Sequence, residues 1–184
     1  MKELFLGELN KVERKGIKQV ATFLEDGDFF TAPASTQYHN VFCGGLAEHS
    51  LGVLNTIRKL NALIKEEERF KDDSLVLVAL LHDVCKAQCY KVNRLKNGSL
   101  SDAKPYVSED VFPVGHGEKS VIQLLRLGLD LTEEEMIAIR YHMLCFDDTG
   151  MRNQKSWNKL TKLLFLADFY TTNFIDKEFK KEAE

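Results

Sequence analysis

The segment from Leu75 to Ala87 constrains the fold of this chain more than any other. Its first seven residues, 75–81, are all apolar. A helix that is apolar on nearly all sides is stable only when other elements surround it. We therefore expect a central helix over 75–87, preceded by N-cap candidates at 72–74 and carrying His82 and Asp83 near its end.

The three prolines, Pro33, Pro105 and Pro113, lie in two short stretches and leave the rest of the chain free to form helices. Apolar residues recur at helical spacing elsewhere. We expect further helices over 9–24, 46–63, 116–128, 132–142 and 154–173, with a capping box opening the one at 132. In 88–115, a strand-like segment at 90–92 and an Asn97-Gly98 turn predict a small β-hairpin and loop. The fold class predicted is all-α with this insertion.

The length of 184 residues predicts one domain over 1–184. A net charge of −3 provides no general attraction to nucleic acid or anionic lipid. The four cysteines form no CxxC pair or disulfide framework and are expected to be reduced thiols. The N-terminus lacks the apolar run of a signal peptide, and the longest apolar stretch is too short to span a bilayer. We therefore expect a cytoplasmic protein that does not enter a membrane.

Six residues that can bind metals occur in apolar, mostly helical surroundings, and this series points to chemistry. They are His49, His82, Asp83, His116, His142 and Asp168. Neutral imidazole and carboxylate are ligands of divalent transition metals, and ligands from several helices converge when the helices pack around one point. Lys86 lies four residues after His82, so its ammonium can reach the same region and suits an anionic phosphate. The series predicts a metal-dependent hydrolase site.

The order of these residues resembles the H...HD...D signature of the HD-domain metal-dependent phosphohydrolases, over about residues 30–175. The resemblance implies a helical bundle of about six to seven helices, with 88–115 as an insertion after the HD pair. It also implies that His49, His82, Asp83 and Asp168 bind one metal. The additional histidines His116 and His142 are similar to those of the subset with dinuclear sites, in which they and a bridging Asp83 would bind a second metal. Lys86 matches the lysine that commonly follows the HD pair.

Two shorter segments extend the resemblance. Pro33-Ala34, His39 and the stretch 44–50 resemble the HD domain of bacterial 3'-5' exoribonucleases, and 115–120 with 139–143 is similar to stand-alone bacterial HD hydrolases. Cys85 is a departure, because many relatives with dinuclear sites have glycine there. This difference affects the shape of the site beside Lys86 but not the set of metal ligands.

The function that follows from this resemblance is hydrolysis of a phosphate ester, in a nucleotide or a related compound, by a metal-bound hydroxide. Asp83 and Lys86 are the expected catalytic residues, and Lys86, His39 and Arg140 the expected substrate contacts. The expected cofactor is a divalent transition metal, two ions per chain, chosen from Mn, Fe, Co, Ni and Zn. The expected partner is a small phosphorylated substrate rather than long nucleic acid, and no feature predicts an oligomeric state.

Two other functions stay open. Some HD proteins with the same series of ligands hold two irons and oxidise a substrate with oxygen, and a non-catalytic module could bind a nucleotide without turning it over. Alternatives also stay open for single residues. Lys86 can serve as a cation at a helix C-terminus, His39 as a loop histidine packed on the helix at 46–63, and Arg140 as a surface residue. His116 and His142 can contact substrate instead of metal.

Overall fold

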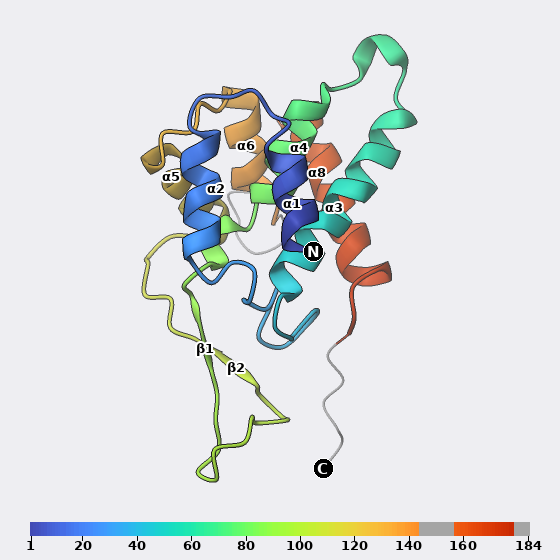
Figure 1. The fold of residues 1–184 in the computed structure, drawn as a ribbon. Helices are drawn as coiled ribbons and strands as arrows, with labels where there is room; N and C mark the ends of the chain where they lie inside the picture. The colour runs from blue at the N-terminus through green and yellow to red at the C-terminus, as the bar shows by residue number, and fades with distance from the viewer. Residues whose placement is uncertain (144–156, 179–184) are drawn as a thin grey trace.

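A computed structural model of the chain describes residues 1–143 and 157–178. Within them it has seven α-helices, two β-strands and two short 3-10 helices (Figure 1). The helices are α1 (Lys2–Leu9), α2 (Ile17–Asp26), α3 (Gly45–Ala62), α4 (Asp72–Leu81), α5 (His116–Arg126), α6 (Glu133–Tyr141) and α8 (Lys159–Phe174). The strands are β1 (Tyr90–Val92) and β2 (Tyr106–Ser108), and the 3-10 helices are Glu66–Glu68 and Val84–Lys86. The predicted all-α fold with a hairpin insertion is confirmed.

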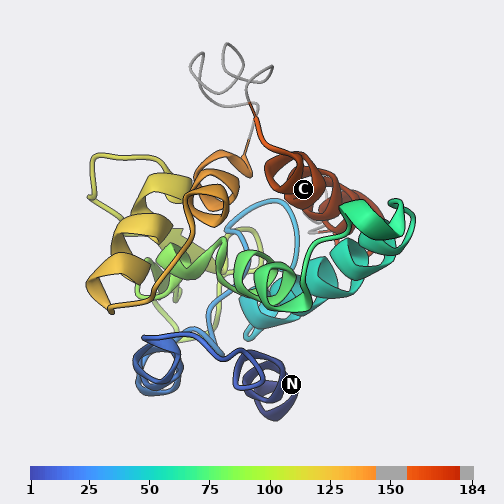
Figure 2. The same cartoon turned by 90° about the horizontal axis from the view of Figure 1, so that it is seen from above.

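Helix α4 lies at the centre of the molecule, as its composition predicts. All seven residues from Leu75 to Leu81 are buried. Seen from above, α4 lies between α3, α6 and α8 on one side and α1 on the other (Figure 2). Each buried Leu or Val contributes roughly 1.5–3 kcal/mol to stability. The packing therefore fixes the end of α4 firmly inside the bundle.

The end of α4 differs from the prediction of a helix through residue 87. The α-helix ends at Leu81, and the chain tightens into the 3-10 helix Val84–Lys86. Residues three apart are eclipsed in a 3-10 turn. This brings the Lys86 ammonium directly onto the Asp83 carboxylate, with Nζ 2.6 Å from Oδ2. Apolar periodicity does not reveal such a change, because it depends on the pairing of two polar side chains.

The N-terminal region also differs from the single helix predicted over 9–24. Two helices, α1 and α2, are joined by a turn in which Gly16 has a φ of +88°. A Cβ on Gly16 would lie 2.3 Å from the Gly128 carbonyl oxygen, so only glycine fits. Val12 is buried within the turn, which explains why the apolar pattern looked continuous.

The hairpin and the last two helices match their predictions closely. Strands β1 and β2 are antiparallel, pair Tyr90 with Ser108, and extend away from the helical body (Figure 1). The capping box of Thr132 and Glu135 opens α6 as predicted. Asn158 caps α8, so the described part of this helix begins at Lys159; the predicted start at Gln154 lies outside the described residues.

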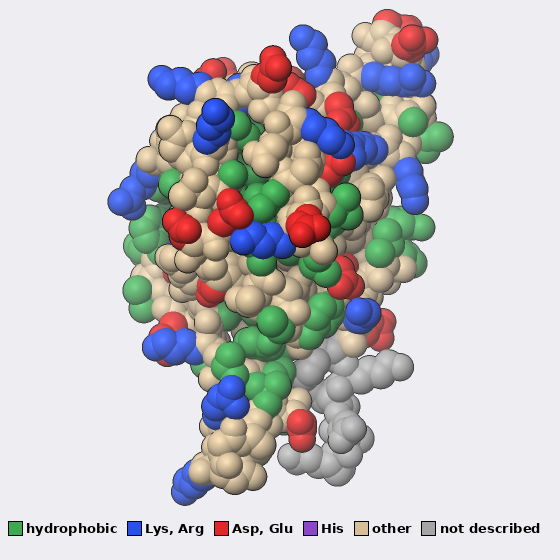
Figure 3. All heavy atoms as spheres, in the orientation of Figure 1, with side chains coloured by type: hydrophobic (Ala, Val, Ile, Leu, Met, Phe, Trp, Pro, Cys, Tyr) green, Lys and Arg blue, Asp and Glu red, His purple; other side chains and the backbone are tan. Residues whose placement is uncertain are grey.

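The surface is mixed in charge. Figure 3 shows Lys, Arg, Asp and Glu side chains spread over the helical body, with hydrophobic side chains gathered where the hairpin meets it. Among the described helices, none has both the length and the apolar character needed to cross a bilayer.

Glu135 joins three separated parts of the fold, and its removal provides a stability test. Its buried carboxylate accepts hydrogen bonds from Arg14, from Ser74 Oγ at 2.8 Å and from the Thr132 backbone N–H at 2.8 Å. We expect Glu135→Gln to lower the free energy of unfolding by about 2 kcal/mol at neutral pH. This is less than the loss for fully buried pairs, because Arg14 is partly exposed. Denaturant titration would measure the loss, with the exposed Glu134→Gln as the matched control.

The same contribution should depend on pH. Burial raises the pKa of Glu135, but hydrogen bonds from Arg14, Thr132 and Ser74 outweigh it and leave the pKa below the ordinary 4.5. Because the folded-state pKa is lowered, the stabilisation is complete above 4.5 and disappears as the pH falls through the folded-state value. The stabilities of wild type and Glu135→Gln should therefore converge in acid. Equal stabilities at neutral pH would contradict the assignment.

Candidate metal site

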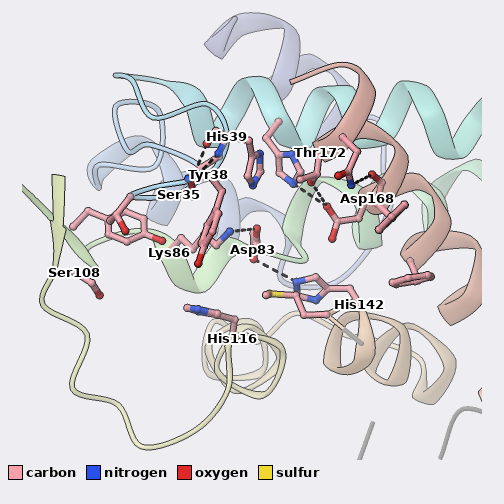
Figure 4. A pocket seen from close by; sticks show the side chains of 18 residues that line it. Ser35, Tyr38, His39, Asp83, Lys86, Ser108, His116, His142, Asp168 and Thr172 are labelled. Atoms are coloured by element: carbon pink, nitrogen blue, oxygen red, sulfur yellow. Dashed lines mark hydrogen bonds and ion pairs between the residues drawn. The ribbon is translucent and has the colours of Figure 1, made fainter. Parts of the chain in front are cut away.

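A cavity of about 440 Å³ lies at the end of α4. Its lining comes from the 34–39 loop, α3, the turn after α4, both strands, α5, α8 and the end of α6. Figure 4 shows Asp83, Lys86, His116, His142 and Asp168 around it. The full lining is Ala34, Ser35, Thr36, Tyr38, His39, His49, Asp83, Lys86, Tyr90, Ser108, His116, His142, Met143, Phe165, Asp168, Phe169, Thr172 and Asn173.

Five of the six predicted ligands meet beside this cavity: four belong to its lining, and His82 contacts two of them. His49 Nε2 lies 3.2 Å from His82 Nε2 and 3.2 Å from Asp168 Oδ1. The two oxygens of Asp83 divide between two histidines, with Oδ2 at 3.4 Å from His82 Nε2 and Oδ1 at 3.4 Å from His142 Nε2. Side chains from α3, α8 and the ends of α4 and α6 thus present ligand atoms to one small volume.

Local structure determines which ring nitrogen of His82 and His142 faces the centre. Each is the C-cap of its helix, α4 and α6, where the last carbonyls lack intrahelical partners. His82 Nδ1 lies 2.9 Å from the Ala79 carbonyl and His142 Nδ1 lies 2.7 Å from that of Ile139. A carbonyl can only accept, so Nδ1 must carry the hydrogen in both rings. Each Nε2 then offers a lone pair to the cavity when the ring is neutral.

His49 is oriented by a different acceptor. Its Nδ1 donates to Asp176 Oδ2 at 2.7 Å, which leaves Nε2 facing His82 and Asp168. Burial would lower the pKa of His49, but hydrogen bonds with Asp168 and Asp176 outweigh it and raise the pKa to about 9. The same interactions hold the pKa of Asp168 well below its usual range. This part of the site therefore attracts positive charge strongly.

The converging acceptors leave unsatisfied atoms. In the described part of the chain, Asp83 Oδ1 and His142 Nε2 are buried without a hydrogen-bond partner. An unsatisfied buried polar atom costs about 1–3 kcal/mol, and more when it is charged. A divalent cation bound by these atoms would satisfy them, and a set of imidazole and carboxylate ligands fits a transition metal. The residues present therefore fit a metal ion.

Lys86 adds a buried cation to the site. Its Nζ lies 2.6 Å from Asp83 Oδ2, and the side chain is almost fully enclosed. Burial would lower the pKa of Lys86, but the Asp83 carboxylate outweighs it and raises the pKa. The ammonium therefore stays charged in neutral solution, next to the proposed ligands.

The other predicted residues lie at the edge of this arrangement. His116, the first residue of α5, lines the cavity with Nδ1 3.7 Å from Cys85 Sγ, but it is in none of the three ligand clusters found among the described residues. His39 lines the cavity and packs its ring on His49, with centroids 4.8 Å apart. Arg140 pairs with Glu118, lies over the Tyr141 ring and is not part of the cavity lining.

Asp176 is the residue that sequence reasoning missed. It follows the end of α8 and binds both His39 and His49. The only available signal was its position eight residues after Asp168, and its backbone is no longer helical there. Cys85 and Cys89 are free and buried, and Cys145 lies outside the described residues.

Comparison with known proteins agrees with this arrangement. A family model described as the HD domain matches residues 46–173. Searches of curated proteins and of solved structures returned no match. The matched range includes all six predicted ligands and excludes His39 and Asp176.

Asp83 faces both His82 and His142, so removal of its carboxylate should release the metal. We expect Asp83→Asn, which keeps the shape of the side chain, to lower metal content per chain at least tenfold relative to wild type. Elemental analysis of protein purified without chelator would measure this, with Asp102→Asn in the exposed part of the hairpin as the control. An Asp83→Asn protein with full metal content would rule out this ligand.

Proposed function

We propose that this chain, which belongs to the HD-domain family, is a metal-dependent phosphohydrolase. Its substrate would be a phosphate ester of a nucleotide or a related compound. The observation that carries the proposal is the buried Lys86–Asp83 pair beside the converging histidine nitrogens. A metal site and a fixed cation on the same cavity both stabilise the charge that develops when a phosphate ester is hydrolysed. The single domain over 1–184, with its core at 30–175, is part of the same proposal.

Six residues would hold the metal. His49, His82, Asp83 and Asp168 would bind one divalent ion, and His116, His142 and the other Asp83 oxygen a second. The division of the two Asp83 oxygens between His82 and His142 supports a bridging role for this carboxylate. The expected ion is Mn, Fe, Co, Ni or Zn. Such ions polarise a phosphoryl oxygen and lower the pKa of bound water toward neutrality.

Side chains of the protein supply the rest of the chemistry. Asp83 holds the Lys86 ammonium in place, and burial strengthens the attraction of that ammonium for a substrate phosphate. As negative charge develops on the phosphoryl oxygens, the fixed cation stabilises it without reorganisation. The aromatic side chains of Tyr38, Phe165 and Phe169 line the same cavity and offer apolar surface to a nucleoside. His39 and Arg140 stay predicted substrate contacts, and Arg140 would first have to leave Glu118.

The activity test is phosphate release from a panel of nucleoside monophosphates, dinucleotides and cyclic nucleotides. We expect hydrolysis with manganese or another transition metal, and its loss on adding a chelator. Oxygen uptake by the iron-loaded protein without phosphate release would replace the proposal with the oxygenase. Nucleotide binding without either reaction would replace it with the binding module.

Lys86 provides a test of the mechanism apart from metal binding. We expect Lys86→Met, which keeps the volume of the stem, to lower kcat by roughly 10²- to 10³-fold while metal content stays at the wild-type level. The exposed Lys91→Met on β1 is the matched control. Unchanged turnover in Lys86→Met would remove Lys86 from the mechanism.

A further inference from the structure

Asp176 lies beyond the range matched by the HD-domain model, yet its carboxylate is fully engaged at the site. Its Oδ2 accepts from His49 Nδ1 at 2.7 Å and from His39 Nδ1 at 2.6 Å. Its Oδ1 accepts from Asn40 Nδ2 at 2.9 Å. The side chain is only 3% exposed, so water cannot replace these donors easily. One carboxylate thus sets the orientation of two histidine rings.

The need for this carboxylate follows from the position of His49. His82 and His142 use free carbonyls at the ends of their own helices. His49 lies in the second turn of α3, where the backbone carbonyls already accept intrahelical hydrogen bonds. An acceptor for its Nδ1–H must therefore come from elsewhere in the chain, and Asp176 supplies it.

The backbone around Asp176 is held independently of its carboxylate. Asn40 donates its N–H to the Lys177 carbonyl at 2.9 Å, and its Oδ1 accepts from the Lys177 N–H at 2.9 Å. The Lys177 ammonium pairs with Glu48 at 3.4 Å and lies over the Phe42 ring. The segment at 176–177 would therefore stay attached when the Asp176 side chain is changed.

We propose that Asp176 is a positioning residue of the metal site, which fixes His49 with Nε2 toward the metal and His39 with Nε2 available to the cavity. The inference rests on the proposed function in requiring that His49 binds metal. A carboxylate on Nδ1 fixes the tautomer of a metal-binding histidine and increases its basicity. His39, held by the same oxygen and lining the cavity, would then contact the substrate beside the metal site.

Asp176→Asn tests the proposal. An amide offers one acceptor oxygen, so either the two histidines or Asn40 must face an N–H instead. We expect Co²⁺ affinity to fall about 10- to 100-fold and the absorption spectrum of bound Co²⁺ to change. Isothermal titration and visible spectroscopy measure both on the full chain, without reliance on activity.

Two further variants distinguish the positioning of His49 by Asp176 from the attachment of the segment at 176–177. Lys177→Ala removes the ion pair and the aromatic contact of the segment but leaves Asp176, and we expect wild-type Co²⁺ affinity. His39→Gln should also keep Co²⁺ affinity while lowering kcat/KM. An Asp176→Asn protein that binds Co²⁺ as tightly as wild type would overturn the inference, as would an equal loss in Lys177→Ala.

A measurement on wild type covers the case in which Asp176→Asn does not fold. ¹⁵N NMR of histidine-labelled protein should show His49 hydrogenated at Nδ1, with Nε2 shifting on metal addition. Hydrogen on Nε2 with metal at Nδ1 would overturn the inference while leaving the phosphohydrolase standing. Wild type that binds no Co²⁺ would overturn both.

Discussion

The burial of α4 determines how the other helices pack and where the candidate site lies. Its seven apolar residues require neighbours on all sides, and α1, α3, α6 and α8 provide them. As a result, the end of the helix, with its free carbonyls and the pair His82-Asp83, lies inside the protein. Charged and polar groups placed there must find partners within the bundle, because water has little access. The composition of the site follows from this requirement.

The partners come from helix ends and from one distant loop. His82 and His142 satisfy carbonyls at the ends of α4 and α6, and in doing so they turn their other nitrogens toward the same volume. Asp83 is held by Lys86 on one oxygen and faces His142 with the other. Each side chain satisfies one neighbour and leaves one acceptor directed at the centre. A divalent cation would satisfy the acceptors that lack a partner there, Asp83 Oδ1 and His142 Nε2.

Sequence pattern predicted those parts of the fold that depend on local chemistry. The apolar run of α4, the Thr132–Glu135 capping box and the hairpin around Asn97-Gly98 are all local signals, and all are present. The pattern failed where contacts of particular residues decide, whether distant in the sequence or near. Gly16 precedes α2 in a turn packed against Gly128, and the Lys86–Asp83 pair lies in the 3-10 turn after α4. The periodicity of apolar residues does not indicate either contact.

The candidate site shows the same division. The order of histidines and aspartates pointed to five residues that converge, because these residue types are uncommon in apolar helices unless they have a functional role. Asp176 could not be found in this way, since its role depends on a loop returning to His49 after α8 has ended. The place of His116, beside Cys85 rather than within a ligand cluster, is likewise a matter of tertiary geometry.

Anomalous diffraction from crystals of the protein grown with manganese or zinc would locate the metal directly. We expect an anomalous peak bound by Nε2 of His49 and His82 and by the carboxylates of Asp83 and Asp168. A metal bound elsewhere, or no peak at these side chains in crystals that contain the ion, would contradict it.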